Sequence, residues 1–230
     1  MTDSLLEVIA ITPEDAIAAE RGGATRLEVV RAIDVGGLTP SLHQFQSIRE
    51  AVDVPLRIML RTNGGFEISR SELDQLLAEA VDLRHAGADE FVFGFLNGDG
   101  SLDLPAINKI ISLVAPCPWT LHHAFDHAAD AGAAWQAAAA LPGIDHVLSG
   151  GIRGDLGQGL GTLRQRASWQ SDDVRWLAGG GLVLDHVESL RGAGIGAFHI
   201  GRSARFDRSW GQPIDIDAVR TWREAIDTVG

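Results

Sequence analysis

The 230-residue sequence predicts an α/β fold, specifically a (β/α)8 TIM barrel built by one domain over residues 1–230. Eight short apolar runs rich in Val, Ile, Leu and Phe alternate with amphipathic stretches long enough for helices, which is typical of repeated βα units around a parallel sheet. Polar residues gather where the apolar runs end, as expected at the mouth of a closed barrel.

The expected strands are separated by the dozen or more residues that a parallel crossover needs. An open doubly wound sheet would use the same units, but the first and last strands both have the composition of fully buried strands, which favours a closed ring. The expected strands are residues 5–11, 26–31, 55–61, 90–96, 119–125, 146–149, 175–179 and 197–201.

Helix signals follow the strands at the expected places. Thr12 and Pro13 form an N-cap with a proline in the first turn, and Ser69 with Glu72 forms a capping box. Glycine-containing turns before the next strands predict left-handed helix exits. The only lysine, Lys109, falls in an expected helix over residues 104–114, so a Schiff-base lysine at a strand end is not expected.

Charge and cysteine content restrict the partners. The sequence has 19 basic and 31 acidic residues and a formal charge of −12, so it predicts no binding to nucleic acid or to an anionic membrane surface. With no basic leader followed by an apolar stretch, we expect a cytoplasmic protein. Cys117 is the only cysteine, which excludes an intrachain disulfide and a paired-cysteine metal site within one subunit.

Seven polar residues are the candidate catalytic set, because side chains at strand C-terminal ends converge on one mouth of a barrel. Burial of such charges is costly unless they pair, so a shared cavity would displace their pKa values and suit acid–base chemistry. The alternative is that some of them form a structural ion-pair network or point outward. The set is Glu7, Glu28, Arg61, His122, Asp126, Ser149 and His199.

Alternation along the fifth strand assigns faces to its histidines. Side chains of a strand point alternately to its two faces, which places His122 and Asp126 on one face and His123 on the other. We therefore expect His122 to face the cavity as a general acid or base oriented by Asp126, and His123 to lie under the helices.

Glycine-rich loops after the last two strands predict a phosphate or other anion site, since barrels often bind phosphate there through backbone N–H groups. The alternative is an ordinary tight connection in which glycine serves the turn. A further polar loop, residues 61–66, is a candidate for closing over a ligand. The predicted anion-binding residues are Gly179, Gly180, Gly181, Gly201, Arg202 and Ser203.

Five segments in matching order and spacing resemble the CutC family across nearly the whole chain. The most specific are Gly-Gly-Leu-Thr-Pro-Ser at residues 36–41 and His-His-Ala-Phe-Asp at residues 122–126; the others are residues 61–66, 147–150 and 158–160. The resemblance implies a cytoplasmic barrel with a conserved polar mouth, described as binding copper or taking part in copper homeostasis.

Two departures from the family pattern bear on that implication. Family members often carry cysteines in and after the first two strands, where this sequence has Val, Ile, Ala and Arg. Because Cu(I) prefers soft sulfur ligands, their absence removes the strongest chemical reason for copper binding. The family's usual arginine after the barrel histidine is His123 here.

Two functions stay open at this point. The resemblance implies a CutC-like role in copper homeostasis, with copper as the candidate metal. The polar cavity and anion loops favour instead a lyase or isomerase that acts on a small phosphorylated or carboxylated metabolite. In both cases the expected partner is a small-molecule or anionic ligand, and Trp210 with the stretch after Arg205 offers a candidate contact for a homo-oligomer.

Overall fold

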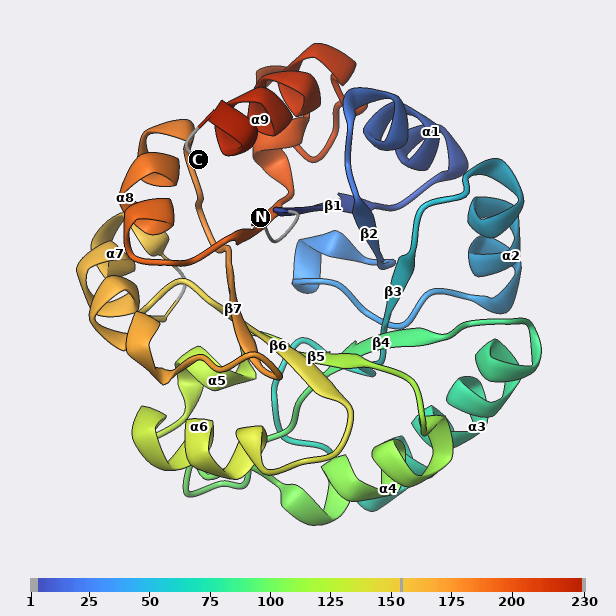
Figure 1. The fold of residues 1–230 in the computed structure, drawn as a ribbon. Coiled ribbons are helices and arrows are strands. Elements are labelled where there is room, and N and C mark those ends of the chain that lie inside the picture. The colour runs from blue at the N-terminus through green and yellow to red at the C-terminus, as the bar shows by residue number, and fades with distance from the viewer. Residues whose placement is uncertain (1–3, 154, 229–230) are drawn as a thin grey trace.

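The computed structural model describes residues 4–153 and 155–228, in which eight parallel strands pair in chain order and close into a barrel (Figure 1). The predicted (β/α)8 barrel is therefore confirmed. The strands are β1 (Leu5–Ala10), β2 (Arg26–Val29), β3 (Leu56–Met59), β4 (Glu90–Phe93), β5 (Trp119–Leu121), β6 (Ile144–Ser149), β7 (Arg175–Ala178) and β8 (Ala197–Ile200).

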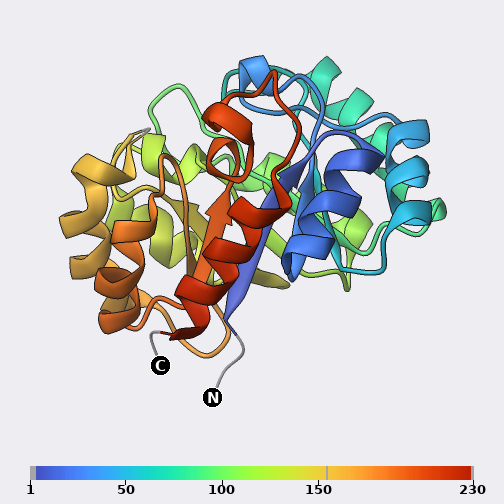
Figure 2. The same cartoon turned by 90° about the horizontal axis from the view of Figure 1, so that it is seen from above.

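The ring closes where the first and last strands meet. β1 pairs with β8 from Leu5 opposite Ala197 to Val8 opposite Ile200, and with β2 on its other side. Both edges of β1 are hydrogen-bonded, so the sheet leaves no open edge there. Figure 2 shows the corresponding helices α1 (Pro13–Gly22) and α9 (Ile216–Thr228) side by side outside the barrel.

Helices surround the ring of strands (Figure 1). None of those described is long and apolar enough to cross a lipid bilayer. The remaining α-helices are α2 (Leu42–Ala51), α3 (Arg70–His85), α4 (Leu104–Val114), α5 (Ala124–His127), α6 (Ala131–Ala139), α7 (Leu156–Gln165) and α8 (Val187–Gly192).

The predicted helix signals are present. Thr12 accepts a hydrogen bond from the backbone N–H of Asp15, and Ser69 with Glu72 forms a complete capping box. Gly23 ends α1 in the left-handed conformation, with φ of 99°. Lys109 lies in α4, whose bounds are those predicted.

All the strands except β6 end earlier than predicted, and this difference matters most at β5. The prediction of a strand over residues 119–125 is wrong beyond Leu121. The chain turns there, because Phe125 N–H donates to the carbonyl of His122 and Asp126 N–H donates to that of His123. Asp126 consequently lies in the short helix α5.

The apolar core fills the layer between the strands and the helices. Trp119, Trp176, Phe91 and Phe198 are fully buried there. A second, smaller apolar group of Leu148, Leu177, Ala197 and Leu5 belongs to β6, β7, β8 and β1. Three of these strands also carry buried or half-buried charged residues, namely Glu7 on β1, Asp145 on β6 and His199 on β8.

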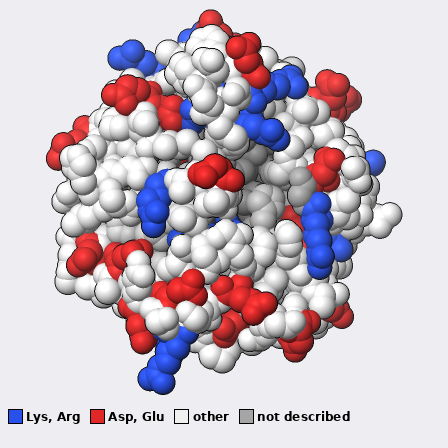
Figure 3. All heavy atoms as spheres, turned by 180° about the vertical axis from the view of Figure 1, so that it is seen from behind, with Lys and Arg blue, Asp and Glu red and all other residues white. Residues whose placement is uncertain are grey.

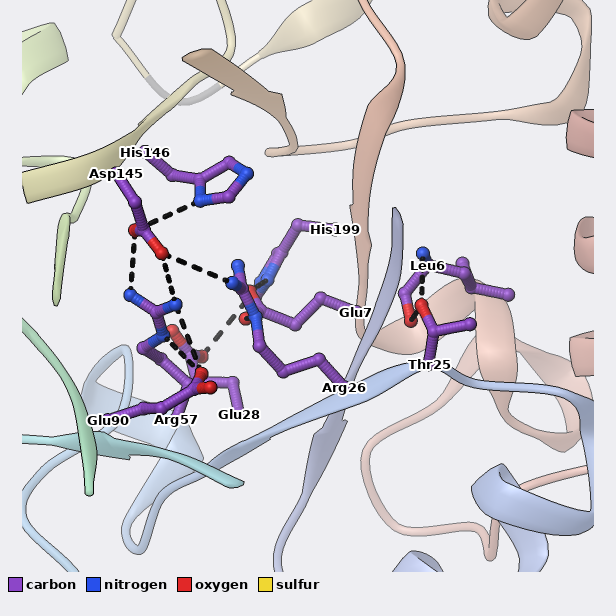
Figure 4. Close-up of polar contacts among 10 residues, drawn as sticks. All are labelled: Leu6, Glu7, Thr25, Arg26, Glu28, Arg57, Glu90, Asp145, His146 and His199. Carbon is purple, nitrogen blue, oxygen red and sulfur yellow. Dashed lines mark hydrogen bonds and ion pairs between the residues drawn. The ribbon is translucent and has the colours of Figure 1, made fainter. Parts of the chain in front are cut away.

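A buried ion-pair network occupies the N-terminal ends of the strands inside the barrel (Figure 4). The guanidinium of Arg57 donates two hydrogen bonds to Asp145, at 2.8 and 2.7 Å, and lies 3.1 Å from Glu90. Arg26 on the adjacent strand donates to Glu7 at 2.5 Å. Both arginines of this network thus have a carboxylate partner, and breaking one such buried pair costs about 3–5 kcal/mol.

Candidate functional site

A pocket of about 760 Å³ opens at the C-terminal ends of the strands. Four of the predicted catalytic side chains line it, namely Glu28, Arg61, His122 and His199. Figure 3 shows the face onto which the pocket opens, where basic and acidic side chains are interspersed. Side chains near the C-terminal ends of different strands thus meet at one mouth of the barrel, although they are far apart in the sequence.

Glu7 lies beneath the pocket and does not line it. One carboxylate oxygen accepts from Arg26 Nε at 2.5 Å and the other from His199 Nδ1 at 2.7 Å. Burial by itself raises the pKa of Glu7, but the charge of Arg26 and the hydrogen bond from His199 outweigh it and hold the pKa well below its ordinary value. Glu7 is therefore a fixed negative charge.

Glu28 is the carboxyl group that titrates near neutrality. Its Oε2 lies 3.9 Å from His199 Nε2, and its Oε1 has no hydrogen-bond partner among the described atoms. Burial raises the pKa of Glu28 to about 7, the charge of Glu7 adds to the rise, and the attraction of His199 opposes it. A carboxyl group with this pKa can both release and take up a proton at neutral pH.

His199 joins the two glutamates (Figure 4). Burial acts to lower its pKa, but the charge of Glu28 and the hydrogen bond and charge of Glu7 raise the pKa above its ordinary value. The two carboxyl groups thus favour the protonated form of the imidazole between them.

Arg61 supplies a buried positive charge held by backbone oxygens. Its guanidinium donates to the carbonyls of Gly36, Gly37, Gly64 and Gly65 at 3.1, 3.5, 2.6 and 3.2 Å. Its Cζ lies 4.9 Å from the centre of the Phe66 ring. Among the described residues no carboxylate is within ion-pair distance of Arg61, so its charge is available to an anionic ligand at the pocket.

His122 is buried and neutral. Its Nδ1 accepts from the backbone N–H of Ala124 at 3.2 Å, and its Nε2 has no partner among the described atoms. Burial and, next, the charge of Arg61 hold the pKa of His122 well below its ordinary value. A neutral ring whose Nδ1 accepts must carry its proton on Nε2.

The predicted pairing of His122 with Asp126 is wrong. Asp126 instead pairs with His123, whose Nδ1 lies 3.0 Å from Asp126 Oδ2, and accepts from Ser149 Oγ at 2.5 Å. Alternation does not apply after Leu121 because the chain leaves the sheet there. His123 lines the pocket, contrary to expectation, whereas Asp126 and Ser149 lie behind it.

Five of the six predicted anion-binding residues line the pocket: Gly180, Gly181, Gly201, Arg202 and Ser203. Gly179 does not. It packs inside the barrel, where a Cβ would lie 2.7 Å from the side chain of Leu148. Gly180 has a φ of 82°, so glycine is needed for the backbone itself as well as for the close approach.

Sequence reasoning missed the buried cations Arg26 and Arg57, although a signal was present. Arg26 lies two positions before Glu28, and Arg57 lies two positions before Met59. Because Glu28 and Met59 line the pocket and strand side chains alternate between two faces, both arginines are expected to point inward. It also missed pocket residues outside the regular strands, which no strand pattern marks, among them His127, Arg208 and Trp210. Phe66, which also lines the pocket, belongs to the loop of residues 61–66 that was predicted to close over a ligand.

The donor atoms do not fit a Cu(I) site. Single ligand atoms of Glu7, Glu28 and His199 lie within 4.8 Å of one another. Both oxygens of Glu7 are already engaged by Arg26 and His199, and Cu(I) prefers thiolate or thioether sulfur to oxygen. Cys117, the only cysteine, precedes β5 at the opposite end of the barrel and belongs to the apolar core.

The raised pKa of Glu28 predicts a pH-dependent stability difference. A carboxyl group with a pKa raised in the folded state binds more protons there, so it destabilises the fold increasingly as the pH rises from about 4.5 to about 7. Glu28→Gln removes this penalty. Its unfolding free energy in urea, relative to wild type, should rise across that window and level off above it. Glu50→Gln, at an exposed site, is the control and should show no such trend.

Comparison with known proteins gives consistent results. The CutC family model matches residues 4–204. A copper homeostasis protein cutC homolog from Mus musculus is 34% identical over 217 residues, which are 94% of this chain and 79% of that protein. A family protein CutC from Xanthomonas campestris is 33% identical over 201 residues, 87% of this chain and 83% of that protein.

Solved structures agree on the fold. A CutC structure from Streptococcus agalactiae superposes with a TM-score of 0.79 at 21% identity, covering 86% of this chain and 98% of that one. Thiamine phosphate pyrophosphorylase from Pyrococcus furiosus reaches 0.65 at 14% identity, covering 98% and 96%. The family model matches residues 4–204 of the chain, and the curated relatives from Mus musculus and Xanthomonas campestris are about a third identical to it. The chain therefore belongs to the CutC family.

Proposed function

We propose that this CutC-family chain is an acid–base enzyme, a lyase or isomerase, that acts on a small phosphorylated or carboxylated metabolite. The observation that carries the proposal is Glu28. Its carboxyl group lines the pocket with one oxygen unpartnered among the described atoms and with a pKa of about 7. Such a group is suited to proton transfer and is costly to keep for stability alone.

Glu7 and His199, the neighbours of Glu28, have different charge states. Glu7 stays ionised through Arg26, and protonated His199 lies between the two carboxyl groups. Glu28 in its ionised form can then take a proton from a substrate carbon next to a carbonyl. The electron pair left behind passes to the carbonyl oxygen, and the proton returns to the same or a neighbouring atom.

Anion binding is supported by other residues that line the pocket. The N–H groups of Gly180 and Gly181 donate no hydrogen bond within the described chain, and both residues line the pocket with Arg202 and Arg208. Arg61 adds a buried charge that lacks a carboxylate partner among the described residues. A phosphate or carboxylate group would satisfy these donors and hold the reacting part of the substrate near Glu28.

The names of the curated relatives suggest a role in copper homeostasis, and we propose this role for the present chain as well. We also propose that the protein is cytoplasmic. The donor atoms at the pocket argue against tight Cu(I) binding as the basis of that role. A metabolic reaction that affects copper handling indirectly is compatible with both the family name and the pocket.

Inorganic phosphate or sulfate should raise the melting temperature of the protein, because an anion that binds only the folded state stabilises it. Arg202→Ala should weaken this rise. Arg220→Ala, which removes the same charge from an exposed position on α9, is the matched control and should keep it. Equal rises in all three proteins would place the anion elsewhere, and no rise in wild type would contradict the anion site.

Proton abstraction can be followed without knowledge of the full reaction. In D₂O, a panel of small 2-keto acids and hydroxyketone phosphates should include compounds whose C–H signals next to the carbonyl are lost by exchange, as measured by proton NMR. Glu28→Gln should slow this exchange by about 10²- to 10⁴-fold, the usual contribution of a general base. Exchange at the wild-type rate in Glu28→Gln would remove Glu28 from the mechanism.

Copper binding is testable directly. Calorimetric titration of the metal-free protein with Cu(I) should show weak binding that His122→Ala and His199→Ala leave unchanged, since Cu(I) prefers sulfur ligands and those of the pocket are nitrogen and oxygen. Tight binding that either substitution abolishes would instead establish a copper site in the pocket.

A further inference from the structure

We propose that the adjacent His122 and His123 form a bifunctional pair at the pocket wall, in which His122 donates a hydrogen bond from Nε2 and His123 accepts a proton at Nε2. The matching ligand class is a carboxylate or carbonyl compound with a neighbouring hydroxyl group. This inference rests on the proposed acid–base function and adds to it a substrate class and a second site of proton transfer.

The first half of the pair follows from the hydrogen bond to His122. A backbone N–H can only donate, so the bond from Ala124 fixes Nδ1 of His122 as an acceptor. The neutral ring then carries its proton on Nε2, which is buried and has no acceptor among the described atoms. An unpaired buried donor is costly, and a ligand oxygen at the pocket is the partner that it lacks.

The second half follows from a chain of hydrogen bonds behind His123. Gly151 N–H donates to Ser149 Oγ at 2.9 Å, so Ser149 directs its own proton to Asp126 Oδ1 at 2.5 Å. Gly150 N–H donates to Asp126 Oδ2 at 2.8 Å. Both oxygens of the fully buried Asp126 side chain thus already act as acceptors, and we assign Nδ1 of His123 as the donor to it.

The other nitrogen of His123 is on the pocket side. About a third of its side chain, 34%, is exposed, and the residue lines the pocket. The backbone of Gly180 passes beside the ring, where a Cβ would lie 3.1 Å from Cε1 and 3.5 Å from Nε2. With Nδ1 held by Asp126, Nε2 is the atom free to take a proton from a ligand, and Asp126 would stabilise the imidazolium that forms.

The two nitrogens suit cleavage of a β-hydroxycarbonyl compound. His123 Nε2 takes the hydroxyl proton, the oxygen left behind forms a new carbonyl, and the adjacent C–C bond breaks. Its electron pair passes to the carbonyl oxygen of the other fragment, where the His122 N–H donates to the resulting enolate. Glu28 in its protonated form then supplies the proton that the enolate carbon takes up, so that protons and electrons balance.

Nitrogen NMR of protein labelled with ¹⁵N at the histidine rings tests the tautomers without any substrate. At pH 8 we expect His122 to carry its proton on Nε2 and His123 to carry its proton on Nδ1, with signals assigned through His122→Gln and His123→Gln. Asp126→Asn should change the ring signals of His123 much more than those of His122. The same tautomer in both rings, two protons on His123, or an unchanged His123 in Asp126→Asn would overturn the inference.

Ligand contact is tested in the same spectra with sodium 3-hydroxypropionate, which carries a hydroxyl group on the carbon β to its carboxylate. This compound should shift the Nε2 signals of both histidines, while the exposed His43 on α2 stays unchanged as an internal control. Failure of either histidine to respond would contradict the pair as a binding site. The tautomers are observed in the free protein, so they test the hydrogen-bond assignment without any substrate. If the expected tautomers were found but no C–H exchange occurred, the proposed enzyme function would be rejected and the hydrogen-bond assignment would stand.

Discussion

The matching of buried charges inside the barrel determines the chemistry of the pocket. Arg26 and Arg57 lie where water is scarce, so each needs a carboxylate in direct contact. Glu7 serves Arg26 and stays ionised, and a second negative charge nearby is then unfavourable. Burial raises the pKa of Glu28 to about 7, the charge of Glu7 adds to the rise, and no arginine among the described residues forms an ion pair with Glu28. The ion pair at the level of Glu7 thus contributes to a titrating carboxyl group at the next level.

The pocket combines two kinds of support. Glu28 and His199 project from strands hydrogen-bonded on both sides, which fixes their positions closely. His122 and His123 lie at the point where the chain leaves β5, and their ring orientations depend on backbone N–H groups and on Asp126. The strands fix where charges meet, and the loop after β5 fixes which ring nitrogen carries each proton.

Much of this arrangement follows from the sequence. Apolar runs predict all eight strands. The convergence of side chains at the strands' C-terminal ends identifies Glu28, Arg61, His122 and His199, because the local sequence shows where a strand ends and which of its side chains point inward. The role of His123 does not follow in this way. It depends on the strand ending at Leu121, which is set by hydrogen bonds in α5 and by Ser149 on the next strand. Because the strand ends at Leu121 and not at residue 125 as predicted, His123 lines the pocket together with His122.

Arg61 has a consequence for redesign of the pocket. One guanidinium binds carbonyls of residues 36 and 37 after β2 and of residues 64 and 65 after β3. These loops belong to different βα units, which in barrels are usually regarded as exchangeable modules. Here both loops are held by Arg61, so a loop from another barrel could replace one of them only if the other loop were replaced with it. We therefore expect the two segments to change together among related proteins.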